Sequence, residues 1–275
     1  MNKVLVLVLS IVSLHGLLSF FVRRKRRESD LVDWSPIESV SVTFFIYFFS
    51  QLFAGFIIFG LLSLTGWNES RIDSWYDSSV VGQFILTCVV QALTVVLLIK
   101  FLHRRKSRLA TVGLSGRPNW SNLKQAIAGY VAYMTFYIIV AIIVDRFLPS
   151  VDLNQKQQIG YDDVSSSLLP LVFINLVILP PLVEELMVRG FLYTGLKQKL
   201  PKIQAIIITS IIFATAHLQA GSSAPLLWVA GIDTFILSIV LIRLREQSGS
   251  LWPPIILHAL KNLVAFMSLF VFHLV

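Results

Sequence analysis

The feature that most constrains this chain is a series of long apolar runs separated by short polar segments. A membrane-spanning helix needs about 20 mostly apolar residues, and eight runs of roughly this length occur in the 275 residues. Only 14% of the residues are charged, against roughly a quarter in soluble domains. The sequence therefore predicts an all-α fold, a polytopic bundle of about eight transmembrane helices. The runs cover residues 3–21, 40–64, 80–101, 124–148, 166–198, 203–220, 224–243 and 251–273.

The chain divides into two predicted parts at residues 149–165, the best candidate for a boundary between them. Residues 1–150 are expected to supply N-terminal scaffold helices, because their apolar runs carry little that could do chemistry. Residues 165–273 hold the ionisable groups that lie inside apolar runs, and we expect them to form a catalytic helical core. The run 3–21 lacks an obvious small-residue cleavage site, which favours an uncleaved anchor over a signal peptide.

Positive charge alternates along the chain in the way that sets membrane orientation. Basic residues concentrate in every second loop, whereas the loops between carry few. Because basic loops are usually cytoplasmic, the sequence predicts an integral, multi-pass membrane protein with its N-terminus outside. The net charge of +8 follows from these loops and not from a nucleic-acid-binding patch, so we expect no nucleic-acid partner. The predicted cytoplasmic segments include residues 23–27, 100–124, 197–202 and 243–245.

Apart from the isolated His15 and His273, the ionisable residues inside the later apolar runs form a small set. Such residues are costly in lipid and are usually paired or functional. Glu185 and Arg189 are four residues apart, in the order that favours an acid–base pair on one helix face. Glu184 points about 100° away round the helix, so we interpret it as a general base rather than as half of a structural pair. The set comprises Glu184, Glu185, Arg189, His217, Asp233, His258 and Lys261.

The segment FATAHL places Phe213 and His217 four residues apart, on one face of a predicted helix. A single histidine in an apolar helix is usually a core residue, but its depth favours another interpretation. Glu184 and His217 lie about equally far on either side of the basic turn near residue 200, roughly 20 Å from it along each helix. A carboxylate and an imidazole that face each other at one depth can hold and activate a water molecule.

The segment LHALKN places His258 and Asn262 on one helix face. Their N–H groups could stabilise an oxyanion, although a polar contact between helices explains the pair equally well. Asp233 and Lys261 lie about equally far from the turn near residue 247, and we interpret them as an interhelical ion pair. A structural role for this pair is favoured over a catalytic one.

Depth along the helices raises one difficulty for this arrangement. His258 lies only about 10 Å from its own turn, against about 20 Å for Glu184. Either the last helix is tilted, or the segment GSLWPP dips into the membrane before the helix begins. Irregular backbone at that depth is tolerated only beside protein or a water-filled cavity, so we expect a cavity reached from the cytoplasmic side. The run 166–198 is too long for one straight crossing, and Pro180-Pro181 is expected to kink it.

Three motifs occur in order: EExxxR at Glu184, Glu185 and Arg189, FxxxH at Phe213 and His217, and HxxxN at His258 and Asn262. With their flanks PLVEELMVRGFL and GSLWPPIILHALKN, they make residues 165–270 resemble the CPBP family. This family comprises CAAX prenyl proteases and bacteriocin-processing enzymes and is related to the type II CAAX endopeptidases.

The resemblance implies an intramembrane peptidase and a role for each motif residue. Glu184 would be the general base that positions the hydrolytic water with His217. His258 and Asn262 would bind the oxyanion, and Glu185, held by Arg189, would shape the site or assist.

The expected partners are membrane lipid and a membrane-associated peptide or protein substrate, which could be lipidated. Two alternatives for a cofactor stay open: none, or one divalent metal such as zinc, held by the two glutamates and the two histidines of the motifs. The chain has no HExxH motif, and Asn262 suits an oxyanion site better than a metal site, which favours a metal-free enzyme. The rival functions are a non-enzymatic immunity or scaffold protein of the same fold and, against the lack of an internal repeat, a proton-coupled transporter.

Overall fold

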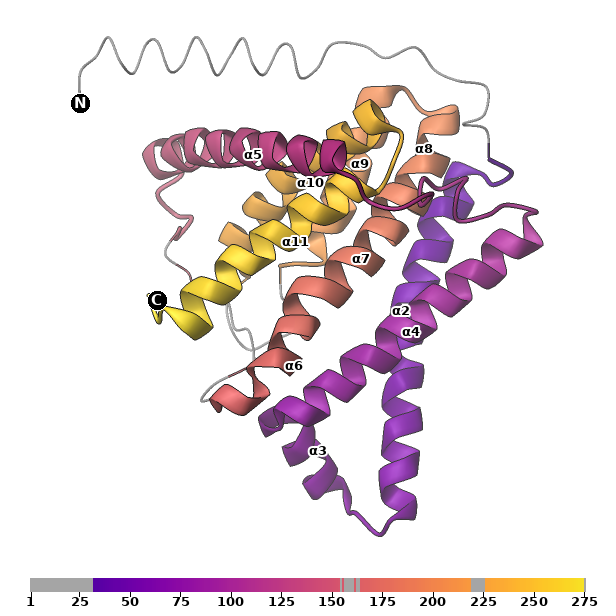
Figure 1. Cartoon of the computed structure of the whole chain (residues 1–275), viewed down its shortest axis with the longest axis vertical. Coiled ribbons are helices and arrows are strands. Elements are labelled where there is room, and N and C mark those ends of the chain that lie inside the picture. The colour runs from indigo at the N-terminus through magenta and orange to yellow at the C-terminus, as the bar shows by residue number, and fades with distance from the viewer. Residues whose placement is uncertain (1–31, 154, 156–160, 162–163, 219–225, 275) are drawn as a thin grey trace.

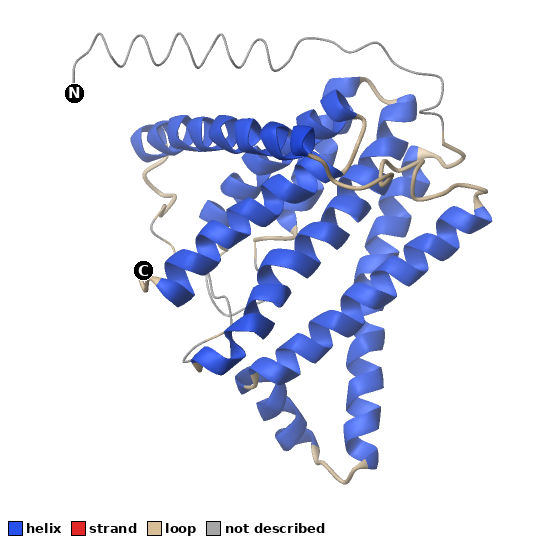
Figure 2. Cartoon of the chain, viewed as in Figure 1, coloured by secondary structure: helices blue, strands red, loops and turns tan. Residues whose placement is uncertain are grey.

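The computed structural model describes residues 32–153, 155, 161, 164–218 and 226–274. Every regular element in these residues is a helix (Figure 2), so the predicted all-α helical bundle is confirmed. The predicted first span, 3–21, and the basic cluster at 23–27 lie outside the described residues. The first half holds α2 (Pro36–Leu64), α3 (Glu69–Ser78), α4 (Val80–Arg104) and α5 (Trp120–Phe147).

The second half begins with one long helical segment that changes its winding along its length. This segment consists of η2 (Ser166–Leu168), α6 (Leu169–Phe173), η3 (Ile174–Ile178), α7 (Leu179–Glu185), η4 (Leu186–Leu192) and α8 (Tyr193–Lys199). Of these, η3 and η4 are π-helical, a winding that occurs often at functional sites. The chain ends with α9 (Lys202–Thr215), α10 (Trp228–Ser248), α11 (Trp252–Phe266) and the π-helical η5 (Met267–Val271).

Five helical segments of the described residues are long and apolar enough to cross a membrane: 36–64, 80–104, 120–147, 166–199 and 252–271. In the described part of the predicted run 203–220, the helix is the 14-residue α9. The predicted run 224–243 forms α10, which carries several charged residues. The number of spans, predicted as about eight, therefore stays a prediction.

Polar capping residues explain why two helices begin earlier than their apolar runs. Ser35 and Glu38 form a capping box at the start of α2, and Asn119 and Asn122 form one at the start of α5. Each box pairs otherwise unsatisfied backbone N–H groups. A search for apolar runs misses such polar first turns, and for the same reason it misses the short, polar α3.

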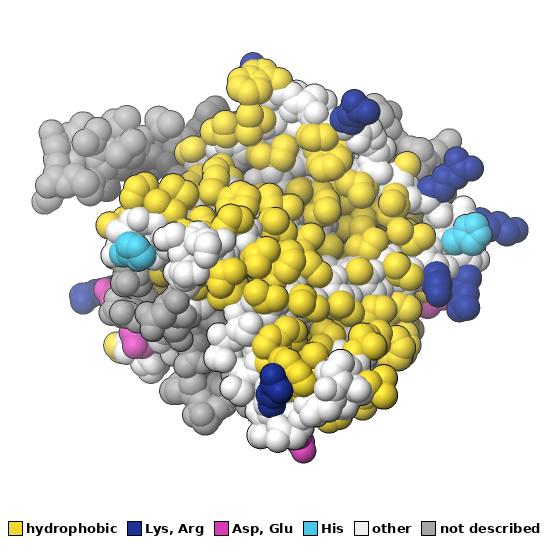
Figure 3. Space-filling view, turned by 60° about the horizontal axis from the view of Figure 1, so that its bottom comes forward, with side chains coloured by type: hydrophobic (Ala, Val, Ile, Leu, Met, Phe, Trp, Pro, Cys, Tyr) yellow, Lys and Arg dark blue, Asp and Glu magenta, His cyan; other side chains and the backbone are white. Residues whose placement is uncertain are grey.

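The helices pack so that the C-terminal half surrounds a polar centre. The 166–199 segment lies between α2 and α4 on one side and α11 on the other, while α5 crosses α10 and α11 (Figure 1). Gly195 allows α8 to approach α2 closely, because a Cβ there would collide with the Ser39 hydroxyl and the Trp34 indole. Hydrophobic side chains cover most of the face in Figure 3, with charged side chains mainly at its margins, which suits a protein surrounded by lipid.

Three of the predicted cytoplasmic segments meet at one end of the bundle. Glu246, near the end of α10, forms ion pairs with Lys197 and Lys202, at 3.1 and 3.2 Å. The N–H of Leu251, just before α11, donates to the carbonyl of Gly113 at 2.9 Å. These contacts bring the basic loops together at one end, as the predicted topology requires. The orientation of the termini and the side of the membrane on which this end lies stay predictions.

Candidate active site

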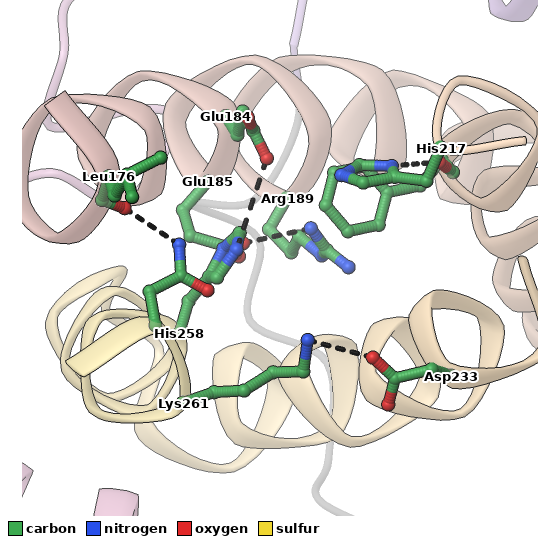
Figure 4. Close-up of polar contacts among 10 residues, drawn as sticks. Leu176, Glu184, Glu185, Arg189, His217, Asp233, His258 and Lys261 are labelled. Carbon is green, nitrogen blue, oxygen red and sulfur yellow. Dashed lines mark hydrogen bonds and ion pairs between the residues drawn. The ribbon is translucent and has the colours of Figure 1, made fainter. Parts of the chain in front are cut away.

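Five of the seven motif residues line a cavity of about 160 Å³ between helices of the C-terminal half. Figure 4 shows the 166–199 segment and His217 along one side of this space and α10 and α11 along the other. The helices α7, α9, α10 and α11 thus all contribute to one site, together with the turn that follows α9. Its lining includes Glu184, Phe213, His217, Asp233, His258, Lys261 and Asn262.

Two prolines create the first contact of this site. In an α-helix the carbonyl of Leu176 would accept from residue 180, and in a π-helix from residue 181. Both positions are proline, which has no N–H. The side-chain amide of Asn262 donates to this carbonyl instead, at 2.8 Å. The pair Pro180-Pro181 therefore anchors α11 to the 166–199 segment through Asn262.

Glu185 is the buried anchor of the cluster. Its Oε1 accepts from Arg189 Nη1 at 2.9 Å and from His258 Nδ1 at 2.9 Å. The side chains of Glu185 and Arg189 are both 0% exposed. The Arg189 guanidinium also lies over the ring of Phe213, with Cζ 4.2 Å from the ring centroid, so the phenylalanine of the FxxxH motif covers a buried cation.

Glu184 has a different environment although it is the adjacent residue. Its side chain is 31% exposed and borders both the central cavity and a second cavity of about 320 Å³. Glu184 Oε2 lies 4.0 Å from His258 Nε2, too far for a direct hydrogen bond, and this oxygen is buried without a hydrogen-bond partner among the described residues. The Glu184 side chain is therefore partly exposed to the cavities, whereas that of Glu185 is not.

The spacing of Phe213 and His217 predicted that both lie on one helix. The structure instead places His217 in the turn just after α9. Its Nδ1 lies 2.8 Å from the carbonyl oxygen of Phe213. Because a carbonyl only accepts, Nδ1 carries the hydrogen and the neutral ring has its lone pair on Nε2. Glu184 and His217 line the same two cavities, but among the described hydrogen bonds and ion pairs none joins them directly.

The interhelical ion pair predicted from depth is present. Lys261 Nζ lies 2.7 Å from Asp233 Oδ2, and the hydroxyl of Tyr133 on α5 donates to the other Asp233 oxygen. The structural role of this pair stays a prediction. Sequence reasoning missed Tyr133, because one tyrosine in an aromatic-rich span has no spacing that marks it. It also missed the Leu176 carbonyl, although Pro180-Pro181 signals an unpaired carbonyl four or five residues earlier.

The start of α11 accounts for the depth of His258. The residues Trp252, Pro253 and Pro254 form the first turn of α11, which suits prolines because first-turn N–H groups need no helical partner. The segment GSLWPP is thus not a long irregular dip into the membrane. The helix packs along η3 and α7 (Figure 1), and His258 meets Glu185 there.

The residues as placed do not match a three-ligand zinc site. A catalytic zinc ion needs three protein ligands around one point. In the described part of the chain, no group of three or more His, Cys, Asp or Glu side chains is close enough to hold a metal ion. In addition, Glu185 Oε1 already accepts from Arg189 and His258. We therefore derive no step through a metal.

Comparison with known proteins agrees with the three motifs. Residues 166–264 match the family model described as Type II CAAX prenyl endopeptidase Rce1-like, which confirms the resemblance to CAAX-type intramembrane proteases for this segment. The matched segment contains all three motifs, and it supports a membrane-embedded endopeptidase activity in general. No curated protein and no solved structure matches the chain.

Proposed function

We propose, from the match of residues 166–264 to this endopeptidase family, that the chain hydrolyses a peptide bond of a membrane-associated substrate. Lipidated peptides are the first substrate class to test. One observation carries the assignment of the base: of two adjacent carboxylates, Glu185 is fully buried and paired, while Glu184 faces a cavity beside two imidazoles. A structural pair would require only Glu185 and Arg189.

In the proposed reaction Glu184 takes a proton from a water molecule as the water oxygen attacks the peptide carbonyl carbon. The unprotonated Nε2 of His217 accepts a hydrogen bond from the same water and orients it. When the carbon–nitrogen bond breaks, Glu184 returns the proton to the leaving amine. Such general acid–base catalysis contributes about 10²–10⁴-fold to a rate.

The carbonyl oxygen, negatively charged after attack, would be stabilised by N–H groups from α11. Asn262 has two amide hydrogens, and the Leu176 carbonyl accepts only one of them. His258 donates from Nδ1 to Glu185, and its Nε2 lies on the Glu184 side of the ring. Because a neutral ring has only one N–H, we propose that His258 acts as the imidazolium, in which Nε2 also donates. Removing one oxyanion donor typically lowers kcat by about 10²–10³-fold.

The second cavity supplies a route for a substrate held in the membrane. It lies between α2, α4, α7 and α9 and reaches Glu184 and His217. Its α2 wall includes Phe44, Tyr47 and Phe48, whose side chains are exposed on the outer surface of the bundle. An apolar chain in the bilayer could therefore lie against α2 while the peptide bond reaches Glu184.

The test uses the full chain in lipid nanodiscs and a farnesylated, internally quenched peptide with a CaaX terminus. Glu184→Gln should lower the cleavage rate by about 10³-fold, within the range for a lost general base, without changing the unfolding temperature. Glu246→Gln is the matched control, because this carboxylate lies at the basic end of the bundle, and it should cleave at the wild-type rate. Full activity of Glu184→Gln would refute the proposal.

A second arm compares peptide termini in membranes of cells that carry wild-type protein or Glu184→Gln. Under the proposal, specific membrane-associated peptides accumulate uncut in the variant. If no terminus depends on Glu184 and the variant keeps the cellular effect of the wild type, a non-enzymatic scaffold is the correct function instead.

A further inference from the structure

Lys261 stands where it can act on the same substrate atom as His258 and Asn262. The three residues occupy positions i, i+3 and i+4 of α11, which lie on one helix face, and all three line the central cavity. Figure 4 shows the Lys261 ammonium directed into the space that faces Arg189 and Glu184. The polar face of α11 therefore presents a formal positive charge beside the two proposed oxyanion donors.

The ammonium is held in place from two other helices. Asp233 on α10 binds Lys261 Nζ at 2.7 Å, and the Tyr133 hydroxyl on α5 donates to the second carboxylate oxygen. An ammonium has three donors, and Asp233 is the only partner that the described contacts give it. Two N–H groups thus remain for a ligand in the cavity that Lys261 lines.

We propose that Lys261 is a catalytic electrophile, a charged third donor to the oxyanion, with Asp233 and Tyr133 as its positioning residues. The inference rests on the proposed peptidase function. As water attacks, the electron pair of the C=O π bond moves onto the carbonyl oxygen, and the ammonium stabilises this negative charge without giving up its proton. When the carbonyl re-forms, the C–N bond breaks and the amine takes its proton from Glu184.

A purely structural pair is the competing explanation. A buried ion pair is often no more stable than neutral residues of similar volume, so stability alone does not require a lysine in this cavity. A fixed cation is useful there because a preorganised positive group stabilises developing charge strongly where water is excluded. Asn262 already commits one amide hydrogen to Leu176, which leaves room for a further donor.

The test neutralises the pair without leaving an unpaired charge. The double variant Asp233→Asn/Lys261→Met keeps similar side-chain shapes, and the amide oxygen that replaces the carboxylate can still accept from the Tyr133 hydroxyl. On the farnesylated CaaX reporter in nanodiscs, its kcat should fall about 10²–10³-fold, with KM and unfolding temperature nearly unchanged. Lys202→Met, which removes an ion-paired lysine far from the cavity, is the control and should keep the wild-type kcat.

A charge exchange, Asp233→Lys/Lys261→Asp, separates the two roles further. It can re-form the ion pair but moves the cation from α11 to α10, so kcat should stay low even where the unfolding temperature is restored. Wild-type kcat in the neutral pair, or recovery of kcat on charge exchange, would overturn the inference. The activity of Glu184→Gln then shows which proposal is wrong. If Glu184→Gln is inactive, only the role of Lys261 is refuted. If Glu184→Gln is fully active, the proposed peptidase function itself is refuted.

Discussion

Substitution by glutamine should have different effects at the two adjacent glutamates, on protein stability at one and on hydrolysis at the other. Glu185→Gln removes the charge that neutralises Arg189 while keeping the side-chain shape. Both partners are 0% exposed and their N···O distance is 2.9 Å, so neither can turn to solvent. Glu184→Gln removes a carboxylate that no cation of the described residues contacts within hydrogen-bond distance, and it should leave the fold intact. We therefore expect loss of stability from the first change and loss of hydrolysis alone from the second.

Two estimates of the cost of Glu185→Gln agree. Unit charges about 4 Å apart attract by about 4 kcal/mol at an effective dielectric constant of 20. Breaking a buried ion pair by removal of one partner costs about 3–5 kcal/mol in measured cases. A loss of 1 kcal/mol lowers the unfolding temperature by about 2–4 °C for a chain of this size. The expected decrease is therefore on the order of 10 °C.

Thermal unfolding of the detergent-solubilised variants measures this difference directly. The double variant Glu185→Gln/Arg189→Met is the control, because it removes both charges and should regain most of the lost stability. Equal unfolding temperatures for Glu184→Gln and Glu185→Gln would refute the division of roles between the two carboxylates. So would a double variant that is no more stable than Glu185→Gln.

Three further outcomes are expected. Asn262→Ala should leave the Leu176 carbonyl unpaired, which should lower the free energy of unfolding by about 1–3 kcal/mol. The same change should also lower kcat. A variant with wild-type stability would contradict the anchoring role of Asn262. Burial raises the pKa of Glu246, but Lys197 and Lys202 lower it more, so its pKa in the folded protein lies below the ordinary value. Its contribution to stability should be fully present above the unfolded pKa of about 4.3 and lost as pH falls through the folded value; unfolding in acid should show this for the wild type but not for Glu246→Gln. Chelators should leave hydrolysis unchanged, and activity that is lost with a chelator and restored by zinc would contradict the metal-free mechanism.

Pairings that depend on position along a helix could be predicted from the sequence. The contact of Glu185 with Arg189 follows from a spacing of four residues, and the contact of Asp233 with Lys261 follows from equal distances to a turn. Both depend only on helix rise and repeat, which are nearly constant. The approach of Glu184 and His217 to one cavity follows from the same arithmetic, whereas the arithmetic placed His258 at a different depth.

Contacts that depend on helix rotation and tilt could not be predicted in this way. The bond between His258 and Glu185 depends on how α11 is rotated and tilted where it packs against α7, and nothing in the spacing of its residues sets that orientation. The apolar pattern also could not predict that α9 ends at Thr215, because the apolar run continues to residue 220. His217 still meets the site because its ring packs on Phe213, with centroids 4.7 Å apart.

The doublet Glu184-Glu185 explains how one segment can serve both the core and the chemistry. Consecutive residues on a helix point about 100° apart, so a doublet on a helix between a packed core and a cavity places one carboxylate in each. The buried carboxylate must be neutralised, and Arg189 one turn later does so. Once Glu185 is fixed, it orients His258 on another helix, and this histidine faces the second carboxylate. The residues that stabilise the bundle and those that we propose to act on the substrate are therefore linked through a single atom, Glu185 Oε1, and a change at that atom should disturb stability and the proposed oxyanion site together.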